Sequence, residues 1–526
     1  MKTRKNVLRL AILMLLVSLF SYTASYSYAF WASSVTGNQD AALAEVPVGE
    51  WGLAVGAPTG IPEYAQGDTY AVGDYVWYEG KIYQIISGDY ASSPPPSNAP
   101  YGAFNEIYHE YKPTNTYYLN DVVLHNGMFY RVINAGVANG AEPGTNGAGW
   151  FNMYSIVWSS GGTYTIGDYV IHNGLLYQAA VDYNLHLNTP GTSLHWRQVG
   201  SVIWNNFTQY AIGDHVLYNG ILYRSLASHT NQTPGTGSNW IEVGSYEWTS
   251  YTAYNKDDIV SYNGSFYIAK RKITGGSVPP SSNAWNTYNM PVWSISGTYL
   301  NGQLVLHNSN LYQVVNATNA NANEPGTSSN AWNRVDTSEY QWFNTYAAND
   351  HVLYSGGVYR VQNVTNANAN TPGTAYNAWN RIDTDQYQDY NVYQANNHIF
   401  HNGDPYKVIH LTNANANTPG TAYNAWNQVN TSEWQWYNTY VLDDYVFFGL
   451  YAYKVVNASN ANNNVEPGTA NNAWNRIGTL YYQSFNTYQT NDIAIYDNVA
   501  YIAIATSTNI IPGETGSESY WELYSN

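Results

Sequence analysis

The sequence contains no cysteine. Neither disulfides nor Cys-ligated metal sites can therefore hold small structural units together. Charged residues are also scarce, at 10% of the chain, and 36 acidic residues stand against 19 basic ones, which gives a formal net charge of -17. A chain with so few Lys and Arg is not expected to bind nucleic acid, because basic side chains are what neutralise its phosphates.

Long apolar runs are missing after the N-terminal region. Residues 1–29 combine basic residues with an apolar run from Leu10 to Phe20 and end on Ser27-Tyr28-Ala29, which is the pattern of a secretory signal peptide. We expect cleavage there and an extracellular location, secreted or at the cell surface, with no integral membrane segment afterwards. The run is short for a membrane span, so an uncleaved anchor is the weaker alternative. Residues 30–60 form a lead-in whose role the sequence does not indicate.

Aromatic residues, by contrast, are abundant, with 53 Tyr and 19 Trp. Together with many Asn, Thr and Gly they are typical of an uncharged, turn-rich all-β protein. A unit of about 47 residues recurs along the chain, which predicts a repeat array in place of several unrelated domains.

The clearest copy of the repeat spans residues 204–243. Two short apolar segments flank Asn219-Gly220, the pair that a two-residue type I′ hairpin turn favours. This turn pairs Val216 with Tyr223 and Leu217 with Leu222, so the hairpin is apolar on both faces. We expect flanking aromatics of the same repeat to close over one of these faces, because a lone hairpin is marginally stable. They are Trp204, Tyr210 and Trp240.

Ten copies share one spacing: a Tyr, a polar residue four positions later and a second Tyr thirteen positions after the first. The first Tyr residues are Tyr70, Tyr117, Tyr164, Tyr210, Tyr254, Tyr299, Tyr346, Tyr393, Tyr440 and Tyr488. The predicted fold is therefore all-β: a tandem array of about ten small antiparallel β-hairpin or three-stranded modules after an N-terminal signal helix. The repeats are assigned to residues 61–106, 107–153, 154–200, 201–244, 245–289, 290–336, 337–383, 384–430, 431–478 and 479–526.

The recurring polar residue is Asp in eight repeats and Gln303 or Asn397 in the others. A short polar side chain at the start of a hairpin is expected to bond nearby backbone donors. A catalytic role is disfavoured, because general acid–base chemistry needs a second carboxylate or His placed opposite, and none recurs.

Histidines recur eight positions after the first Tyr, but other repeats carry Tyr there, as at Tyr218. This exchange favours aromatic packing over metal ligation, and no metal or cofactor is expected. Asn-rich runs in the later repeats, such as residues 318–323, are interpreted as polar loops. A calcium role for these runs is a weaker alternative, since they lack dense carboxylates.

Two further aromatic positions recur. A Trp near the end of each repeat, after a Pro, is expected in the core, because so small a unit needs a large apolar body to bury. Another aromatic stands six positions before each first Tyr and is expected to be exposed and to bind carbohydrate. These residues are Trp158, Trp204, Trp248, Trp293, Trp434, Tyr64, Tyr111, Tyr340, Tyr387 and Tyr482.

The pattern of Trp204, Gly213-Asp214, Tyr218-Asn219-Gly220, Pro234-Gly235 and Trp240 resembles the type-3 chitin-binding domain, carbohydrate-binding module family 5/12. The resemblance extends over nearly all of the chain after residue 60 as divergent tandem copies. It implies a small antiparallel β fold that attaches to chitin or a related polysaccharide and usually accompanies a hydrolase.

The chain departs from that family in two ways. The family's Ala-Lys-Trp-Trp-Thr segment after the second Tyr carries its main sugar-stacking pair, and this pair is absent from all ten repeats; Ala269-Lys270 is followed by Arg271-Lys272, for example. The repeats also leave no segment long enough for a catalytic domain, and no paired-carboxylate or nucleophile motif is found. We therefore expect no enzymatic activity.

Three functions follow as hypotheses. The first is a secreted, non-catalytic, multivalent carbohydrate-binding protein for chitin or a related polysaccharide, gaining avidity from many weak sites. The second is a cell-surface structural protein or adhesin that self-associates and uses the modules as building units. The third, minor, hypothesis is a cell-wall hydrolase. The repeats are expected in a single row with neighbours in contact, because few residues separate them.

Overall fold

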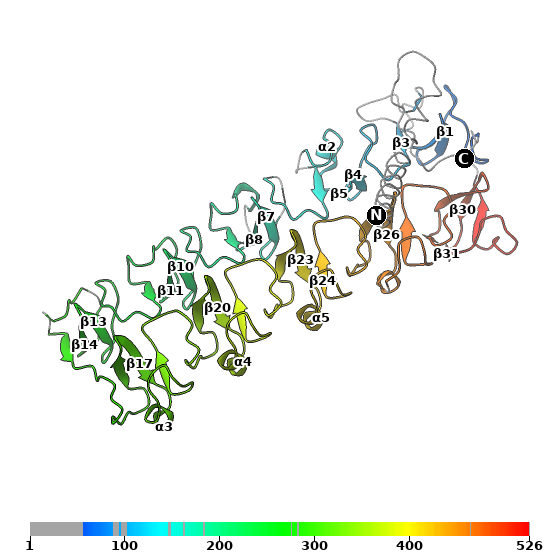
Figure 1. Cartoon of the computed structure of the whole chain (residues 1–526). Coiled ribbons are helices and arrows are strands. Elements are labelled where there is room, and N and C mark those ends of the chain that lie inside the picture. Colours follow the sequence, from blue (N-terminus) through cyan, green and yellow to red (C-terminus); the bar gives the residue numbers. More distant parts are fainter. Residues whose placement is uncertain are drawn as a thin grey trace, which may run out of the picture. The chain divides into compact units, whose positions relative to one another are not determined.

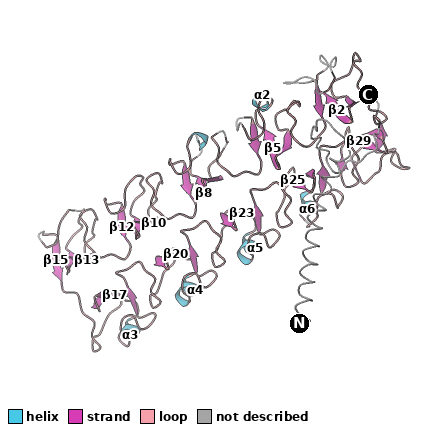
Figure 2. Cartoon of the chain, turned by 45° about the horizontal axis from the view of Figure 1, so that its top comes forward, coloured by secondary structure: helices cyan, strands magenta, loops and turns pink. Residues whose placement is uncertain are grey.

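The structure is a computed structural model of the whole chain. It describes residues 56–87, 94–95, 103–145, 149–160, 162, 164–181, 185–274, 276–280, 283–462 and 464–524, which lie in one compact unit, Gly56–Asn526. The predicted all-β array is confirmed, since small three-stranded antiparallel sheets follow one another along the chain (Figures 1 and 2). The signal peptide, its helix and residues 30–55 of the lead-in lie outside the described residues and stay predictions.

Each sheet defines one module, and its strands follow chain order, with β29, β30 and β32 forming the last one. Modules 1 to 5 contain β1 (Tyr75–Tyr78), β2 (Lys81–Ile85), β3 (Phe104–Glu106), β4 (Val122–His125), β5 (Met128–Val132), β6 (Trp150–Asn152), β7 (Tyr169–His172), β8 (Leu175–Ala179), β9 (Trp196–Gln198), β10 (His215–Tyr218), β11 (Ile221–Ser225), β12 (Trp240–Glu242), β13 (Ile259–Tyr262), β14 (Ser265–Ala269) and β15 (Trp285–Tyr288).

Modules 6 to 10 contain β16 (Leu304–His307), β17 (Asn310–Val314), β18 (Trp332–Arg334), β19 (His351–Tyr354), β20 (Gly357–Val361), β21 (Trp379–Arg381), β22 (His398–His401), β23 (Asp404–Val408), β24 (Trp426–Gln428), β25 (Tyr445–Phe448), β26 (Tyr451–Val455), β27 (Trp474–Arg476), β29 (Ile493–Tyr496), β30 (Val499–Ala503) and β32 (Trp521–Leu523). In module 10, β28 (Thr487–Tyr488) also pairs with β31 (Ser507–Thr508).

The predicted hairpin register is confirmed in module 4. Strand β10 pairs with β11 so that Val216 faces Tyr223 and Leu217 faces Leu222. Asn219 and Gly220 have φ angles of 52° and 80°, the positive values that a type I′ turn requires at both positions. The third strand, β12, adds to β11 through Trp240.

One apolar face of each hairpin carries the module's core. In module 4, Tyr210, Val216, Tyr223 and Trp240 form a buried cluster, with Trp204 packed against it. The terminal Trp is fully buried here, as predicted, and its indole Nε1 donates a hydrogen bond to a loop carbonyl at 2.7 Å. The core therefore needs no disulfide, because large aromatic rings supply the buried area.

The polar residue at each hairpin start makes the predicted backbone bond in all ten modules. In module 4 the Asp214 carboxylate accepts a hydrogen bond from the Ala211 N–H at 2.8 Å. Gln303 and Asn397, the two exceptions in type, accept the equivalent bond through their side-chain oxygens at 3.0 and 2.6 Å. Asp, Asn and Gln side chains all supply the required acceptor oxygen, which supports a structural role for this position.

The prediction of polar loops for the Asn-rich runs is wrong, because these runs form short helices. Within each run a small Ala is buried, as at Ala367, and a side chain caps the start: Asn363 accepts from the Asn366 N–H in α4, and His410 takes the same role in α5. Another Asn of the run bonds the backbone of the module's first Tyr. In module 7, the side-chain oxygen of Asn368 accepts from the Tyr346 N–H, and its amide nitrogen donates to the Tyr346 carbonyl. The helices are α2 (Ala135–Ala138), α3 (Ala317–Ala320), α4 (Val364–Ala369), α5 (Leu411–Ala416) and α6 (Ala458–Ala461), with a 3-10 turn at Leu185–Leu187.

Modules that follow one another in the sequence are in contact, as expected. At the joint between modules 7 and 8, the Asn391 amide group accepts from the Arg381 N–H at 2.8 Å and donates to the Arg381 carbonyl at 2.9 Å. Asn380 makes the same reciprocal pair with the backbone of Val392. The four bonds connect one module's last strand to the next module's first turn. Two Asn residues make the equivalent backbone bonds at each of four other joints: Asn105 and Asn115, Asn333 and Asn344, Asn427 and Asn438, and Asn475 and Asn486.

The modules do not form the expected single row. The chain turns back at modules 5 and 6, and the later modules run antiparallel beside the earlier ones (Figures 1 and 2). Paired modules touch across the two rows. The contacts include Ile82 with Ile495 and Ala500, Phe129 with Tyr445, Tyr169 with His398, and His215 with His351.

The second apolar face of the hairpins explains this pairing. In module 2, Leu124 and Phe129 lie outside the module's own core and form a separate buried cluster with Ala452 of module 9. Phe129 and Ala452 are both 0% exposed, so a large residue in one row meets a small one in the other. A single row would leave this face in water, which is why the chain doubles back.

The backbones of the two rows approach closely at several glycines, for example Gly200 and Gly244. Gly200 and Gly244 have φ angles of 66° and 76°, and a Cβ on either would overlap backbone atoms of Thr384 or Thr337 in the other row. Glycine is thus needed at both places for its missing side chain as well as its positive φ. At the start of the described chain, Thr59 pairs with β30 of module 10 through hydrogen bonds to Asn498 and Ala500.

Among the described residues, no helix has the length and apolar character needed to cross a membrane.

Candidate functional site

The ten aromatics predicted to bind carbohydrate occupy the same place in every module. Each is half-buried and packs one side against the module's core, whereas the sequence predicts an exposed aromatic. Trp204 contacts Tyr218 edge to face, with ring centroids 5.4 Å apart. The other pairs are Tyr64 with Tyr78, Tyr111 with His125, Trp158 with His172, Trp248 with Tyr262, Trp293 with His307, Tyr340 with Tyr354, Tyr387 with His401, Trp434 with Phe448 and Tyr482 with Tyr496.

These contacts confirm aromatic packing for the recurring histidines. In two modules the His also has a carboxylate partner that the sequence did not predict. The Nε2 atoms of His125 and His307 each lie 2.9 Å from the carboxylate of the Glu that precedes the Pro-Gly pair, Glu142 and Glu324. The ring therefore packs on an aromatic on one side and orients a carboxylate on the other.

A surface recess that contains two tryptophans lies in module 9. It has a volume of about 530 Å³ and is lined by Trp434, Trp436, residues 464–466, Thr469 and Ala470. Trp434 is the half-buried aromatic of this module, whereas Trp436 is 42% exposed and contacts Tyr437 edge to face. Two indoles beside polar groups can bind a sugar, because C–H faces of a pyranose pack on aromatic rings while hydroxyls find hydrogen-bonding partners.

Module 7 repeats part of this arrangement. Trp342 stands at the position of Trp436, is 58% exposed and contacts Phe343 edge to face. Thr371 replaces Glu466 there, so the module lacks the carboxylate. Glu466 was missed, although the recurrence of Glu-Pro-Gly in modules 2, 6 and 9 is a signal that could have identified it.

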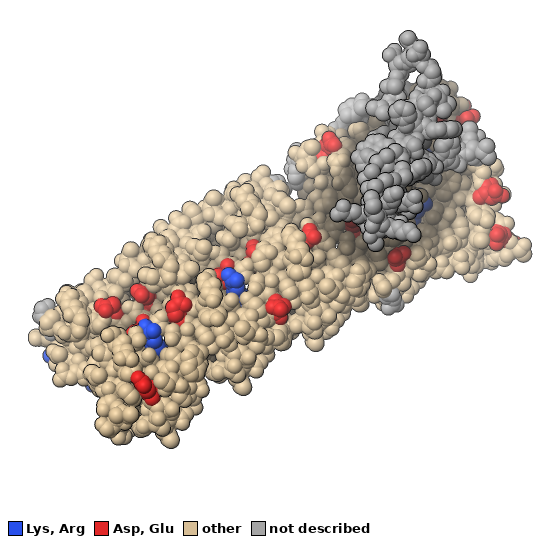
Figure 3. Space-filling model, in the orientation of Figure 1, with Lys and Arg blue, Asp and Glu red and all other residues tan. Residues whose placement is uncertain are grey.

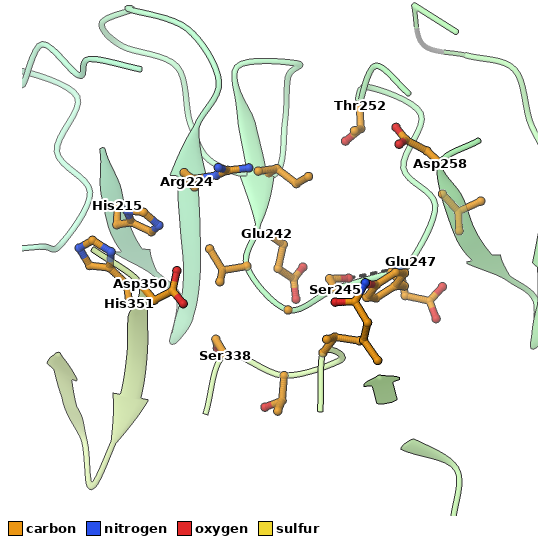
Figure 4. Close-up of a pocket in the computed structure, with 18 of the residues that line it drawn as sticks. His215, Arg224, Glu242, Ser245, Glu247, Thr252, Asp258, Ser338, Asp350 and His351 are labelled. Atoms are coloured by element: carbon orange, nitrogen blue, oxygen red, sulfur yellow. Dashed lines mark hydrogen bonds between the residues drawn. The ribbon is translucent and has the colours of Figure 1, made fainter. Parts of the chain in front are cut away.

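A larger cavity of about 1020 Å³ lies where modules 4, 5, 6 and 7 meet (Figure 4). His215 and His351 stack at one side of it with ring centroids 3.8 Å apart. Burial, followed by the charge of Arg224, lowers the pKa of His215 to about 4. Burial, followed by the charges of His215 and Arg360, lowers that of His351 to about 3. Both rings are therefore neutral at pH 7.

The rest of this cavity is mainly acidic. Burial and repulsion from Glu247 raise the pKa of Glu242, and Glu247 accepts a hydrogen bond from Ser261 at 2.6 Å. None of its described lining residues is a tryptophan, so the cavity lacks the flat indole surface found in module 9. Nor does any group of three or more His, Cys, Asp or Glu side chains in the described chain have metal-binding geometry.

The surface around the modules carries few charges. On the face seen in Figure 3, isolated acidic and basic side chains are scattered over a largely uncharged surface. Such a surface fits an uncharged, hydroxyl-rich partner better than a polyanion.

No protein-family model matches the chain, and a search of curated proteins also finds no match. The resemblance to chitin-binding modules thus rests on the residue pattern alone.

Proposed function

We propose that the protein is an extracellular, non-catalytic, multivalent carbohydrate-binding protein that attaches to chitin or a related polysaccharide. The observation that carries the proposal is the module 9 recess, which is lined by Trp434 and Trp436 together with Glu466 and Thr469. The ten modules place a half-buried aromatic at the same position each time. Weak single sites gain avidity on a polymer when several engage at once.

The sharpest test uses the exposed tryptophans. Replacing Trp342 and Trp436 with Ala should leave the module cores intact, because the two residues are 58% and 42% exposed and belong to none of the buried core clusters of modules 7 and 9. We expect the double variant to lose most of its retention on insoluble chitin, with cellulose and peptidoglycan as comparison matrices. Ile295→Ala, at an 89% exposed apolar residue, is the matched control and should bind as the parent does. If the parent protein is retained on none of these matrices, the proposal is wrong.

The ten half-buried aromatics serve as a second set of variants. Changing Trp434 to Ala would also remove packing from the core cluster of its module, so weaker binding would count only if the thermal unfolding midpoint were unchanged. Trp434→Tyr keeps an aromatic ring of the kind that other modules carry there, and it should bind with modest loss.

A surface structural role is the second candidate. It is supported by the reciprocal Asn bonds at the module joints and by the paired rows, which connect the modules into one body. Under this hypothesis the protein self-associates and sugar binding is lost or secondary. Electron microscopy of the purified protein would show ordered filaments or layers, whereas dispersed single particles that bind chitin would favour the first candidate.

A further inference from the structure

Three modules carry Glu immediately before the Pro-Gly pair, and their surroundings differ in one respect. In modules 2 and 6 the carboxylates of Glu142 and Glu324 lie 2.9 Å from a histidine Nε2. In module 9 the equivalent of that histidine is Phe448, whose ring contacts Trp434 edge to face at 5.4 Å. Phenylalanine cannot donate a hydrogen bond or carry a proton.

The Glu466 carboxylate consequently has neither an ion pair nor a side-chain hydrogen bond with the described part of the chain. It is exposed and lines the same recess as Trp434 and Trp436. The backbone carbonyl of Glu466 accepts bonds from the N–H and hydroxyl of Thr469, which fixes the turn that carries the carboxylate.

An unpaired carboxylate that lines a recess together with two indole rings is suited to a cation. A protonated amine is attracted both by the carboxylate and by the faces of tryptophan rings, which are the strongest aromatic partners for cations. We infer that the module 9 recess selects an amino sugar that bears a free, protonated amine, such as a glucosamine unit in a partly deacetylated chain. This inference rests on the proposed function, and it names the substrate class of that site.

A sugar fits the recess better than a lysine-containing peptide. A recess of about 530 Å³ lies within the usual range for small-ligand sites and exceeds what a single ammonium group would fill. Its two indoles offer flat apolar surface to a ring, while Asn464 and Thr469 offer polar groups to hydroxyls. Modules 2 and 6, with the carboxylate paired to His, are expected to be less selective for the amine.

The test compares two soluble hexasaccharides on the full chain by calorimetry, one of glucosamine and one of N-acetylglucosamine. We expect the glucosamine hexamer to bind more tightly, and its advantage to fall about fivefold in Glu466→Gln, the ratio expected for one exposed ion pair. Phe448→His should have a similar effect, because it restores the partner present in modules 2 and 6. Four other modules carry His at this position, so the substitution is compatible with the fold.

A reciprocal variant tests the opposite change in another module. His307→Phe frees Glu324 in module 6 and should increase the preference for the glucosamine hexamer. Equal binding of both sugars by the parent protein and by all three variants would overturn the inference and leave the proposed function intact. Preferential binding of a lysine-rich peptide would overturn it in favour of a protein partner. Binding of neither sugar, with no retention on any polysaccharide, would instead refute the proposed function.

Discussion

At the residue scale, the first Tyr of every module has a role that its recurrence alone did not reveal. The Tyr346 hydroxyl accepts a hydrogen bond from the Gln341 N–H at 2.7 Å and donates one to the Gln341 carbonyl at 3.1 Å. The same pair forms in modules 1 to 9 with the residue five positions earlier, as between Tyr210 and Asn205, and in module 10 the Tyr488 hydroxyl accepts the equivalent bond from the Gln483 N–H. The hydroxyl thus fixes the backbone directly after the half-buried aromatic, and with it the position of the candidate binding ring.

Removing one such hydroxyl should destabilise its module. Tyr346→Phe keeps the buried ring and leaves the Gln341 N–H without its partner, which is expected to cost about 1–3 kcal/mol. Hydrogen exchange of the Gln341 amide should accelerate accordingly. Tyr376→Phe, at a 48% exposed tyrosine of the same module, should leave that exchange rate unchanged. Equal protection in Tyr346→Phe and the parent would contradict this role.

At the element scale, the joints between modules are of two kinds. Five joints carry reciprocal Asn pairs, and the described residues give no such pair at the joint between modules 5 and 6, where Asn286 is exposed. Asn380 and Asn391, by contrast, are 7% and 9% exposed. The Asn pairs therefore couple neighbouring sheets through buried bonds.

Disrupting one pair should uncouple two neighbouring modules. Asn391→Ala leaves the backbone N–H and carbonyl of Arg381 unpaired and is expected to cost about 2 kcal/mol locally. Hydrogen–deuterium exchange should increase on both sides of the joint between modules 7 and 8. Asn286→Ala is the matched substitution at a joint without the pair and should change exchange little. If both variants behave alike, the Asn pairs do not couple the modules.

At the scale of the whole described unit, the rows meet partly through buried histidines. His215 stacks on His351, His398 stacks on Tyr169, and burial lowers the pKa of His398 to about 4. In an unfolded chain these groups titrate near about 6.5. Between that pH and about 4 the unfolded state binds protons that the folded state does not, so stability falls as the pH falls. Asp350, whose pKa is raised by partial desolvation, acts in the opposite sense.

Acidification should therefore loosen the rows. We expect the thermal unfolding midpoint to fall as the pH falls from 7 toward about 4. The double variant His215→Leu and His351→Leu should show a smaller fall, because it removes two of the groups that take up protons on unfolding. Leu is compatible with this position, since apolar Ile259 and Leu304 occupy it in modules 5 and 6. A pH dependence identical to that of the parent would show that this histidine stack does not control the row contact.

The candidate site was only partly predictable. The positions of the half-buried aromatics could be predicted from the spacing, because an aromatic residue stands six positions before the first Tyr in every repeat. The recess in module 9 depends on Trp436 and Glu466, which lie far apart in the sequence and are brought together by the fold. That Glu466 lacks a histidine partner became apparent only when His125 and His307 were seen beside their carboxylates.

The sequence by itself determined the module: the turn at Asn219-Gly220, the register that it imposes, and the Tyr and Trp core all depend on residues close together in the chain. The tertiary structure alone decided that the modules pair in two rows and that the Asn-rich runs become helices. Hairpins with two apolar faces require a second covering surface, but local spacing does not say which module provides it. That choice depends on complementary shapes, such as Phe129 against Ala452, which exist only after the chain has turned back.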